Sequence, residues 1–393
     1  MYSLLLLIIY IAFISLGLPD SLMGSAWPVI QTELGIPVSF AGIITMIIAG
    51  GTIVSSLLSD RLTKKLGAGL VTAVSVCMTA AALFGFSFST EFWMLCVWSV
   101  PYGLGAGAVD AALNNYVALH YAPRHMSWLH CFWGIGAAVS PYIMGYGLTG
   151  GLGWNNGYRI VFYVQIALTA ILFVSLPLWK KKAGNDSLEK QPQTKGLGLK
   201  NALKIKGVIP ILITFFAYCS LETTAGLWAS SYLVKYRGID ANTAAKFASL
   251  FYIGITGGRA VCGFVSEKLG DKRLIRIGIA AIFLGVALIA VPVDCNILAL
   301  TGLSVVGIGC APVYPSIIHA TPDNFGKENS QAIIGIQMAS AYVGTTFMPP
   351  LFGLIAQYVQ IGLYPIYLLI FAVLMIVMSE KLNGIVLRKK IKA

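Results

Sequence analysis

Charged side chains are scarce in this chain. Only 15 of its 393 residues are acidic and 27 are basic, so charged residues make up 11% of the sequence and hydrophobic residues 57%. Soluble domains average about 25% charged residues. A chain with so few charges cannot cover itself with a water-compatible surface. The composition therefore excludes an ordinary soluble protein and predicts a lipid bilayer as the surroundings.

Clusters of metal-binding or nucleophilic residues are also missing. The four histidines stand at positions 120, 125, 130 and 319, and the seven cysteines are scattered without a CxxC spacing. A membrane enzyme would need a metal cluster or a nucleophile beside a base, so we expect no enzyme and no cofactor. The net charge of +12 forms no basic stripe with interleaved aromatic residues, which argues against a nucleic-acid partner.

Long apolar runs fill most of the sequence. A helix needs about 20 apolar residues to cross a bilayer, and the breaks between the runs are charged or rich in Gly and Pro. The pattern predicts an all-α membrane protein with twelve transmembrane helices. The expected spans are 3–30, 38–59, 68–87, 92–119, 127–149 and 158–179, followed by 208–233, 242–266, 274–292, 296–320, 331–357 and 363–383.

A long polar segment lies at the middle of the chain. It contains many lysines and predicts a linker, 180–207, between two six-helix bundles at 1–179 and 208–393. Most basic residues fall in the linker and in the short loops on the same side of the membrane. Because short cytoplasmic loops carry the excess of Lys and Arg, we expect both termini to be cytoplasmic.

The two predicted bundles carry similar loops. An acid ends the second span and another ends the eighth span 207 residues later, and basic residues follow each. Such an acid can bind the N-terminus of a neighbouring helix, and the bases can hold the loop at lipid headgroups, which predicts a gating or structural role. The residues are Asp60, Arg61, Lys64 and Lys65 in the first loop, and Glu267 and Lys268 in the second. Repeated six-span halves are typical of secondary transporters, with the substrate site near mid-membrane between the repeats.

Three acids lie inside apolar runs: Asp20, Asp110 and Glu222. An ionisable side chain is expensive there, and its default interpretation is a functional site. Pro19 and Gly17 can loosen the helix beside Asp20 and free backbone groups to face a cavity. We expect these acids to take part in proton coupling, with Glu222 as the second bundle's counterpart of Asp20. The alternative is a structural carboxylate paired with a neighbouring helix.

Asn114 follows Asp110 by four residues and so shares its helix face. A carboxylate beside an amide suits a hydroxyl-bearing ligand, although an interhelical polar clamp is the alternative. His130 in the fifth span is a candidate proton relay, because histidine titrates near neutral pH, or else a hydrogen-bonded packing residue.

Arg259 in the eighth span needs a carboxylate partner to be tolerated in a low dielectric. The sequence leaves Glu222, Asp110 and Asp20 open as that partner. Further substrate-binding candidates are amides, which could bind a polar solute, and aromatic residues, which could stack on a sugar. The alternative for each of them is a role in helix packing or at the membrane interface. They are Asn115, Trp27, Trp133, Trp228, Tyr252, Tyr314 and Gln337.

The loop around Asp60, together with the similar loop at Glu267, resembles the signature loop of the major facilitator superfamily. The twelve expected spans match that family along the whole chain. Asp20 and the stretch from Asp110 to Asn115 look like the fucose permease group of proton-coupled sugar symporters. In that group the fourth-span acid is Glu and a Pro stands at the position of Asn115.

The resemblance implies a secondary transporter that moves a small polar solute, a sugar, by alternating access coupled to protons. In this mechanism Asp20 takes a proton on the outside and releases it inside, while Asp110 and Asn114 hold the substrate. A drug/proton antiporter and a sodium-coupled symporter of the same fold remain open. We expect a monomer that spans the inner (plasma) membrane of a bacterium several times.

Overall fold

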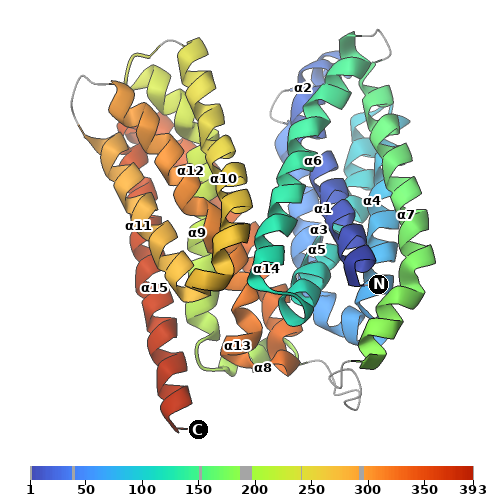
Figure 1. The fold of residues 1–393 in the computed structure, drawn as a ribbon. Helices are drawn as coiled ribbons and strands as arrows, with labels where there is room; N and C mark the ends of the chain where they lie inside the picture. The colour runs from blue at the N-terminus through green and yellow to red at the C-terminus, as the bar shows by residue number, and fades with distance from the viewer. Residues whose placement is uncertain are drawn as a thin grey trace. The chain divides into compact units, whose positions relative to one another are not determined.

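The computed structural model describes residues 2–37, 40–149, 153–185, 197–239, 241–291 and 296–392. Within these ranges the chain is helical and contains no strand (Figure 1). The helices up to the linker are α1 (Tyr2–Asp20), α2 (Leu22–Glu33), α3 (Ala41–Leu66), α4 (Ala68–Ser87), α5 (Phe92–His120), α6 (Pro123–Thr149) and α7 (Gly153–Asn185). Part of the predicted linker, 186–196, lies outside the described residues.

The later helices begin with the short α8. They are α8 (Leu199–Lys204), α9 (Val208–Lys235), α10 (Ala241–Leu269), α11 (Asp271–Ala290), α12 (Asn296–His319), α13 (Thr321–Phe325), α14 (Lys327–Ile355) and α15 (Tyr364–Lys392). A π-helical turn, η2 (Ala356–Gln360), and a 3₁₀ turn, η3 (Ile361–Leu363), join α14 to α15. The prediction of an all-helical protein is confirmed.

Nine helical segments of the described chain are long and apolar enough to cross a membrane. One of them, Lys327–Lys389, runs through both α14 and α15 and is 63 residues long. The count of twelve spans therefore stays a prediction, although long helices lie over each of the expected ranges.

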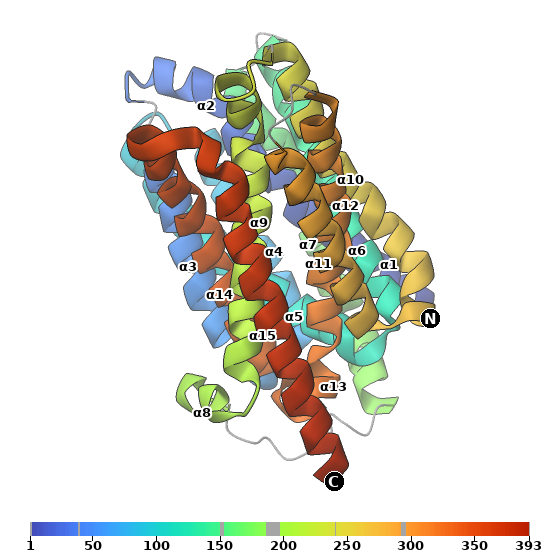
Figure 2. The same cartoon turned by 90° about the vertical axis from the view of Figure 1, so that its left-hand side faces the viewer.

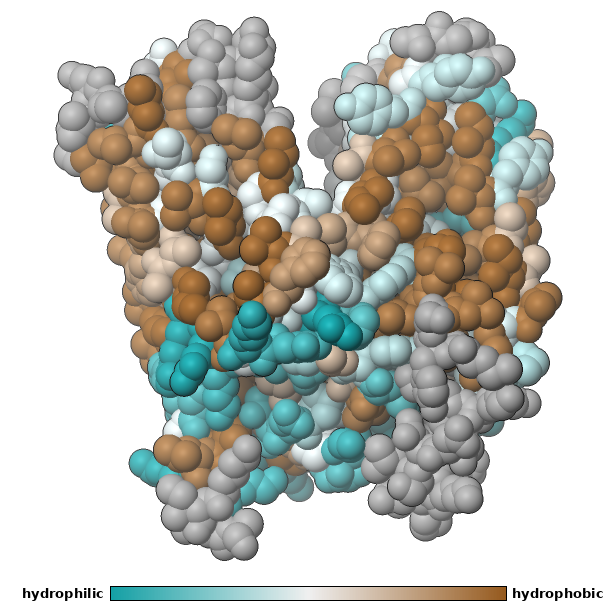
Figure 3. All heavy atoms as spheres, in the orientation of Figure 1, coloured by the Kyte–Doolittle hydropathy of each residue, from teal (hydrophilic) through white to brown (hydrophobic). Residues whose placement is uncertain are grey.

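Apolar side chains cover much of the outer surface. Tyr142 and Val174 are each 81% exposed, and Phe264 is 73% exposed. Figure 3 shows apolar residues over the visible face of each half of the chain. Such extensive exposed apolar surface is typical of a protein surrounded by lipid.

The chain divides into two compact units. Unit 1 contains Met1–Tyr116 and Leu129–Gly198, and unit 2 contains Val117–Trp128 and Leu199–Ala393. The segment Val117–Trp128, which joins α5 to α6, thus belongs with the later helices although it falls within the range 1–179. Each unit is described by itself below.

In unit 1, glycines allow α1 and α6 to touch at the backbone. A Cβ on Gly17 would collide with the carbonyl oxygen of Trp133 and would lie 2.9 Å from the backbone nitrogen of Ala137. A Cβ on Gly136 would collide in turn with the carbonyl oxygen of Ile14. Small residues at membrane helix contacts permit this close approach. The contact fixes α6 beside the end of α1, where Asp20 lies.

In unit 2, glycine contacts join α11 to α12. A Cβ on Gly278 would lie 2.6 Å from the carbonyl oxygen of Gly309, and one on Gly285 would lie 2.7 Å from that of Gly302. Helix α15 packs along α9 and α11, as Figures 1 and 2 show from two sides. Helix α9, which carries Glu222, is in contact with α15 along its length.

A similar glycine turn joins two helices in each unit. Gly67 joins α3 to α4 with φ 80° and ψ 153°, and Gly270 joins α10 to α11 with φ 72° and ψ 156°. Glycine is favoured at both positions because a positive φ is strained for other residues. The helices that follow the two turns are each 20 residues long, which agrees with the expected internal repeat.

Candidate functional site: buried acids and their partners

Asp20 is the last residue of α1, at a break before α2. Its Oδ2 accepts a hydrogen bond from Nε1 of Trp133 at 2.9 Å, and its Oδ1 accepts one from the hydroxyl of Tyr102 at 3.1 Å. The donors come from α6 and α5, while the Asp20 side chain itself is exposed at the surface of the unit. Residues of three helices therefore meet at this carboxylate, and each of its two oxygens accepts a hydrogen bond from an uncharged donor.

The helix break beside Asp20 is held by a second contact. Ser21, between α1 and α2, donates from its hydroxyl to the carbonyl oxygen of Ala137 at 2.6 Å. Pro19 precedes the break within α1 and has no N–H to donate to the helix. The predicted loosening of the helix around Asp20 is therefore present, and α6 supports it through Ala137 and Trp133.

Asp110, Asn114 and His130 form a hydrogen-bonded chain across α5 and α6. Nδ2 of Asn114 donates to Oδ1 of Asp110 at 2.8 Å and to its backbone carbonyl at 3.0 Å. Nε2 of His130 lies 3.1 Å from Oδ1 of Asn114, and the ring of Phe13 packs edge-on against the imidazole at 5.5 Å between centroids. The expectation that Asp110 and Asn114 share a helix face is confirmed.

The hydrogen bonds of this chain of side chains determine which nitrogen of the His130 imidazole carries a hydrogen. Because Nδ2 of Asn114 faces two acceptors on Asp110, Oδ1 must be the atom that faces His130. An amide oxygen only accepts, so Nε2 of His130 carries a hydrogen and donates it. Asn114 is fully buried and His130 is 6% exposed, whereas the side chain of Asp110 is partly exposed.

Glu222 is the partner of Arg259, a choice that the sequence left open among three acids. Oε1 of Glu222 in α9 lies 3.2 Å from Nη2 of Arg259 in α10. The Arg259 side chain is 5% exposed and that of Glu222 is 21% exposed. Unit 2 thus contains a nearly buried ion pair whose acidic partner alone reaches the surface.

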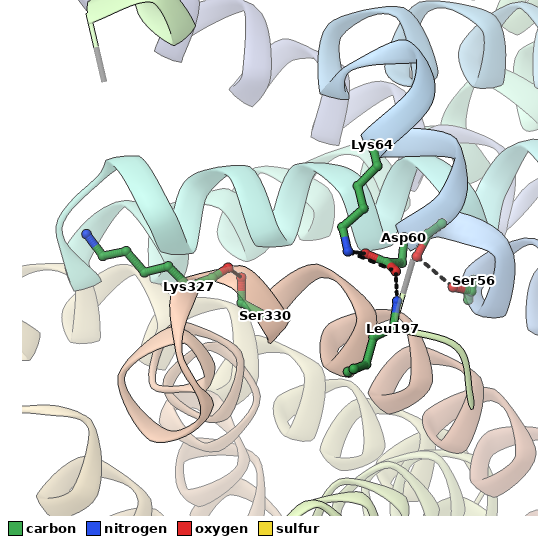
Figure 4. A network of polar contacts seen from close by, with 7 residues as sticks. Ser56, Asp60, Lys64, Leu197, Lys327 and Ser330 are labelled. Carbon is green, nitrogen blue, oxygen red and sulfur yellow. Dashed lines mark hydrogen bonds and ion pairs between the residues drawn. The ribbon is translucent and has the colours of Figure 1, made fainter. Parts of the chain in front are cut away.

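In the first loop, Asp60 is buried and binds backbone as well as a cation. Its Oδ1 lies 3.1 Å from Nζ of Lys64, and its Oδ2 accepts from the backbone N–H of Leu197 at 3.1 Å (Figure 4). Leu197 lies two residues before α8, so the acid holds the chain just ahead of a helix. Arg61 and Lys65 are exposed.

In the second loop, Glu267 pairs with a residue of the segment Val117–Trp128. Its Oε1 lies 3.3 Å from Nε of Arg124, and both side chains are 46% exposed. Lys268 beside it is exposed. Close by, the indole of Trp128 donates to the carbonyl oxygen of Ala260 at 3.3 Å and packs on Phe264.

The family model described as Major Facilitator Superfamily matches residues 9–330 and 211–387. The chain belongs to the major facilitator superfamily. It is therefore an integral membrane transporter, and the expectation that it is no enzyme is confirmed. The described residues contain no group of three or more His, Cys, Asp or Glu side chains that could hold a metal ion.

Several proteins with different names are similar to this chain. Bypass of stop codon protein 6 of Saccharomyces cerevisiae is 22% identical over 391 residues, which cover 91% of this chain and 78% of the yeast protein. Quinolone resistance protein NorA of Staphylococcus aureus is 25% identical over 249 residues, 62% of each chain. The crystal structure of the E. coli fucose:proton symporter FucP has a TM-score of 0.77, with 96% of this chain and 98% of that chain covered at 14% identity. These similarities establish the superfamily fold.

The remaining candidate residues of this superfamily member lie in several environments. Trp27 is 6% exposed within the hydrophobic core of unit 1, and Asn115 is also 6% exposed. Trp228 donates to the carbonyl oxygen of Pro349 at 2.9 Å and so joins α9 to α14. Tyr252 is 54% exposed, and its hydroxyl lies over Gly226.

Two further candidates lie inside unit 2. The hydroxyl of Tyr314 donates to the sulfur of Met338 at 3.2 Å. The carboxamide of Gln337 is fully buried and lies 3.2 Å from the hydroxyl of Thr321.

Two residues that contact the ionisable candidates were missed from the sequence. Tyr102 donates to Asp20 from 82 residues away, and no local pattern marks it. Tyr218 contacts the guanidinium of Arg259 and donates to the carbonyl oxygen of Cys310 at 3.0 Å. Because Tyr218 precedes Glu222 by four residues on α9, helical spacing could have found it.

Proposed function

We propose that this protein is a secondary transporter that moves a small polar solute, a sugar in the first instance, by alternating access coupled to protons. Its superfamily membership and its structural similarity to the fucose:proton symporter support the proposal. The further terms of the proposal are a monomer in a bacterial inner membrane with both termini in the cytoplasm.

The observation that carries the proposal is the setting of Asp20. Among the described residues no Lys or Arg pairs with this carboxylate, so its protonation breaks no ion pair. The two neutral donors also differ: the hydroxyl of Tyr102 can rotate and accept, whereas the indole N–H of Trp133 can only donate. The proton therefore belongs on Oδ1, the oxygen that faces Tyr102, and Trp133 keeps the side chain in place.

Asp110 and Asn114 are assigned to the substrate. The carboxylate of Asp110 is partly exposed and its orientation is set by the buried amide of Asn114. A carboxylate that is fixed in this way can accept hydrogen bonds from two neighbouring hydroxyls of a sugar. His130 binds the oxygen of the Asn114 amide, and through that amide it helps to orient Asp110.

The test is uptake by the purified protein in proteoliposomes. Asp20→Asn should abolish accumulation driven by a pH gradient while exchange of labelled solute across the membrane continues, because exchange needs no net proton transfer. Asp110→Asn should lose solute binding itself, as measured by titration. Glu91→Gln, which changes an exposed acid, is the matched control and should behave as wild type. Wild-type accumulation by the Asp20 variant would refute the assignment.

A drug/proton antiporter is the second candidate, and the similarity to NorA favours it. The direction of proton movement separates the two: a symporter takes up protons with the solute, and an antiporter releases them against it. Solute uptake that depends on sodium at clamped pH would instead assign sodium as the coupling ion.

The solute class can be screened before transport is measured. A thermal-shift screen of hexoses, deoxyhexoses and other small solutes at two pH values should reveal ligands, since a ligand that binds the native state raises its apparent stability. A sugar that raises the unfolding temperature more at the lower pH supports the proposal.

A further inference from the structure

The ion pair of Arg259 and Glu222 is incomplete. A planar guanidinium has five N–H donors and binds a carboxylate best through two parallel hydrogen bonds. Here one oxygen of Glu222 meets one nitrogen, Nη2, at 3.2 Å. Glu222 therefore binds Arg259 through a single contact and not through the two parallel hydrogen bonds that would bind it most strongly.

One donor of Arg259 is left over. Its Nε is buried and has no hydrogen-bond partner among the described residues. Nε–H and one N–H of Nη2 point along the same edge of the guanidinium, which is the edge that chelates a carboxylate side-on. Glu222 occupies half of that edge. A buried charge with an unsatisfied donor is costly, and the cost is removed when a second oxygen arrives at Nε.

The surroundings of the arginine suit a polar ligand that carries such an oxygen. The hydroxyl of Tyr218 contacts the guanidinium, and the ring of Tyr314 lies 6.0 Å from that of Tyr218 and 4.7 Å from that of Phe215. Aromatic faces with hydroxyl groups pack well on the apolar and polar sides of a small hydroxylated molecule. The 21% exposure of Glu222 gives an approach to the pair from the surface of unit 2.

We propose that Arg259 binds a carboxylate of the transported solute along its Nε–Nη2 edge, so that the solute is a sugar acid or another small hydroxy acid. The proposal rests on the proposed proton-coupled transport. The incoming carboxylate takes Nη2 from Glu222, and Glu222 takes up one proton from water. Before binding, the site holds the positive charge of Arg259 and the negative charge of Glu222. After binding, Glu222 is neutral and the solute carboxylate is the counter-ion of Arg259, so the net charge of the site is unchanged. Uptake of one proton thus accompanies each solute anion.

The experiment compares acids with their neutral counterparts on the purified full-length protein. The probes are D-glucuronate against D-glucose, D-galacturonate against D-galactose, gluconate against sorbitol, and lactate against 1,2-propanediol. Binding is measured by thermal shift and by titration calorimetry, and proton uptake by a pH dye in weak buffer. At least one acid should bind more tightly than its partner, with about one proton taken up per anion.

The variants separate the role of each partner. Arg259→Gln should weaken binding of that acid roughly 10- to 100-fold, the loss expected for one hydrogen bond between charged groups, since Nη2 is already bonded to Glu222 before the solute binds. Arg276→Gln is the matched control, because it removes an exposed arginine of the same unit that pairs with Glu380 at 2.7 Å, and it should bind as wild type. Glu222→Gln should still bind the acid, with the proton uptake abolished and an affinity that no longer depends on pH. This second readout applies even if the Arg259 variant does not fold.

A panel in which no acid exceeds its neutral partner overturns the proposal, as does unchanged proton uptake in Glu222→Gln. Failure of the proposed function has a different result: proteoliposomes would show no uptake of either probe class driven by a pH gradient. Uptake of a neutral sugar that Arg259→Gln leaves unchanged would keep the transport function and overturn the carboxylate site.

Discussion

Replacement of Gly17 by Ala should destabilise the protein although alanine is the better helix former. Gly17 lies within α1 where that helix meets α6. In a helix interior, Ala is favoured over Gly by roughly 0.5–1 kcal/mol. The added methyl group, however, would collide with the carbonyl oxygen of Trp133 and lie 2.9 Å from the nitrogen of Ala137.

The expected magnitude follows from what the methyl group meets. Carbon contacts are most favourable at about 3.5–4.0 Å, so α1 and α6 must separate by roughly 1 Å. Backbone atoms cannot turn aside as a flexible side chain can, which places the cost near the upper end of the roughly 1–3 kcal/mol typical of overpacking. After the helix preference is subtracted, Gly17→Ala should lose roughly 2 kcal/mol.

The control is Gly24→Ala in α2, where a Cβ would meet nothing within 4 Å. This variant should gain roughly 0.5–1 kcal/mol, so the two alanines should differ by about 3 kcal/mol. Thermal unfolding in detergent gives the order of stability of the two variants and the wild type. Uptake should fall in Gly17→Ala as well, because Trp133 also holds Asp20. A Gly17→Ala protein as stable as Gly24→Ala would refute the close contact of α1 and α6.

Two more predictions concern single contacts. Asn114→Leu should remove the hydrogen bonds that the amide makes with His130 and with the carboxylate of Asp110, at roughly 0.5–1.5 kcal/mol for each bond. Thermal unfolding should show a lower midpoint, and solute binding should be lost. Gly263→Ala should displace the indole of Trp128, whose Cε2 lies 2.6 Å from the expected Cβ, and should change tryptophan fluorescence and lower the unfolding temperature. Gly257→Ala on the same helix has open space and should leave both measurements unchanged.

The sequence predicted features that depend on neighbouring residues in the chain. The Asp110 and Asn114 bond follows from a four-residue helical spacing. The break after Asp20 lies next to Pro19, which has no N–H and so removes one helical hydrogen bond. The helical class followed from the length of the apolar runs. In the first two cases the cause lies within about one turn of the residue concerned.

Contacts between distant segments could not be predicted in the same way. Tyr102 and Trp133 reach Asp20 from 82 and 113 residues away, and the glycine contact between α1 and α6 brings Trp133 there. The partner of Arg259 required the packing of α9 against α10, because charge alone allowed three acids. Arg124 belonged to a short loop in the sequence, and only the structure joins it to Glu267.

The amide at position 114 limits the routes open to a proton in unit 1. Its Nδ2 donates to the carboxylate and to the backbone carbonyl of Asp110, and its Oδ1 accepts from the imidazole. The amide cannot pass a hydrogen onward without becoming an unstable imidic acid. Asp110 and His130 are thus insulated from each other although one side chain bridges them. The carboxylate can therefore gain and lose a hydrogen without any change at the imidazole.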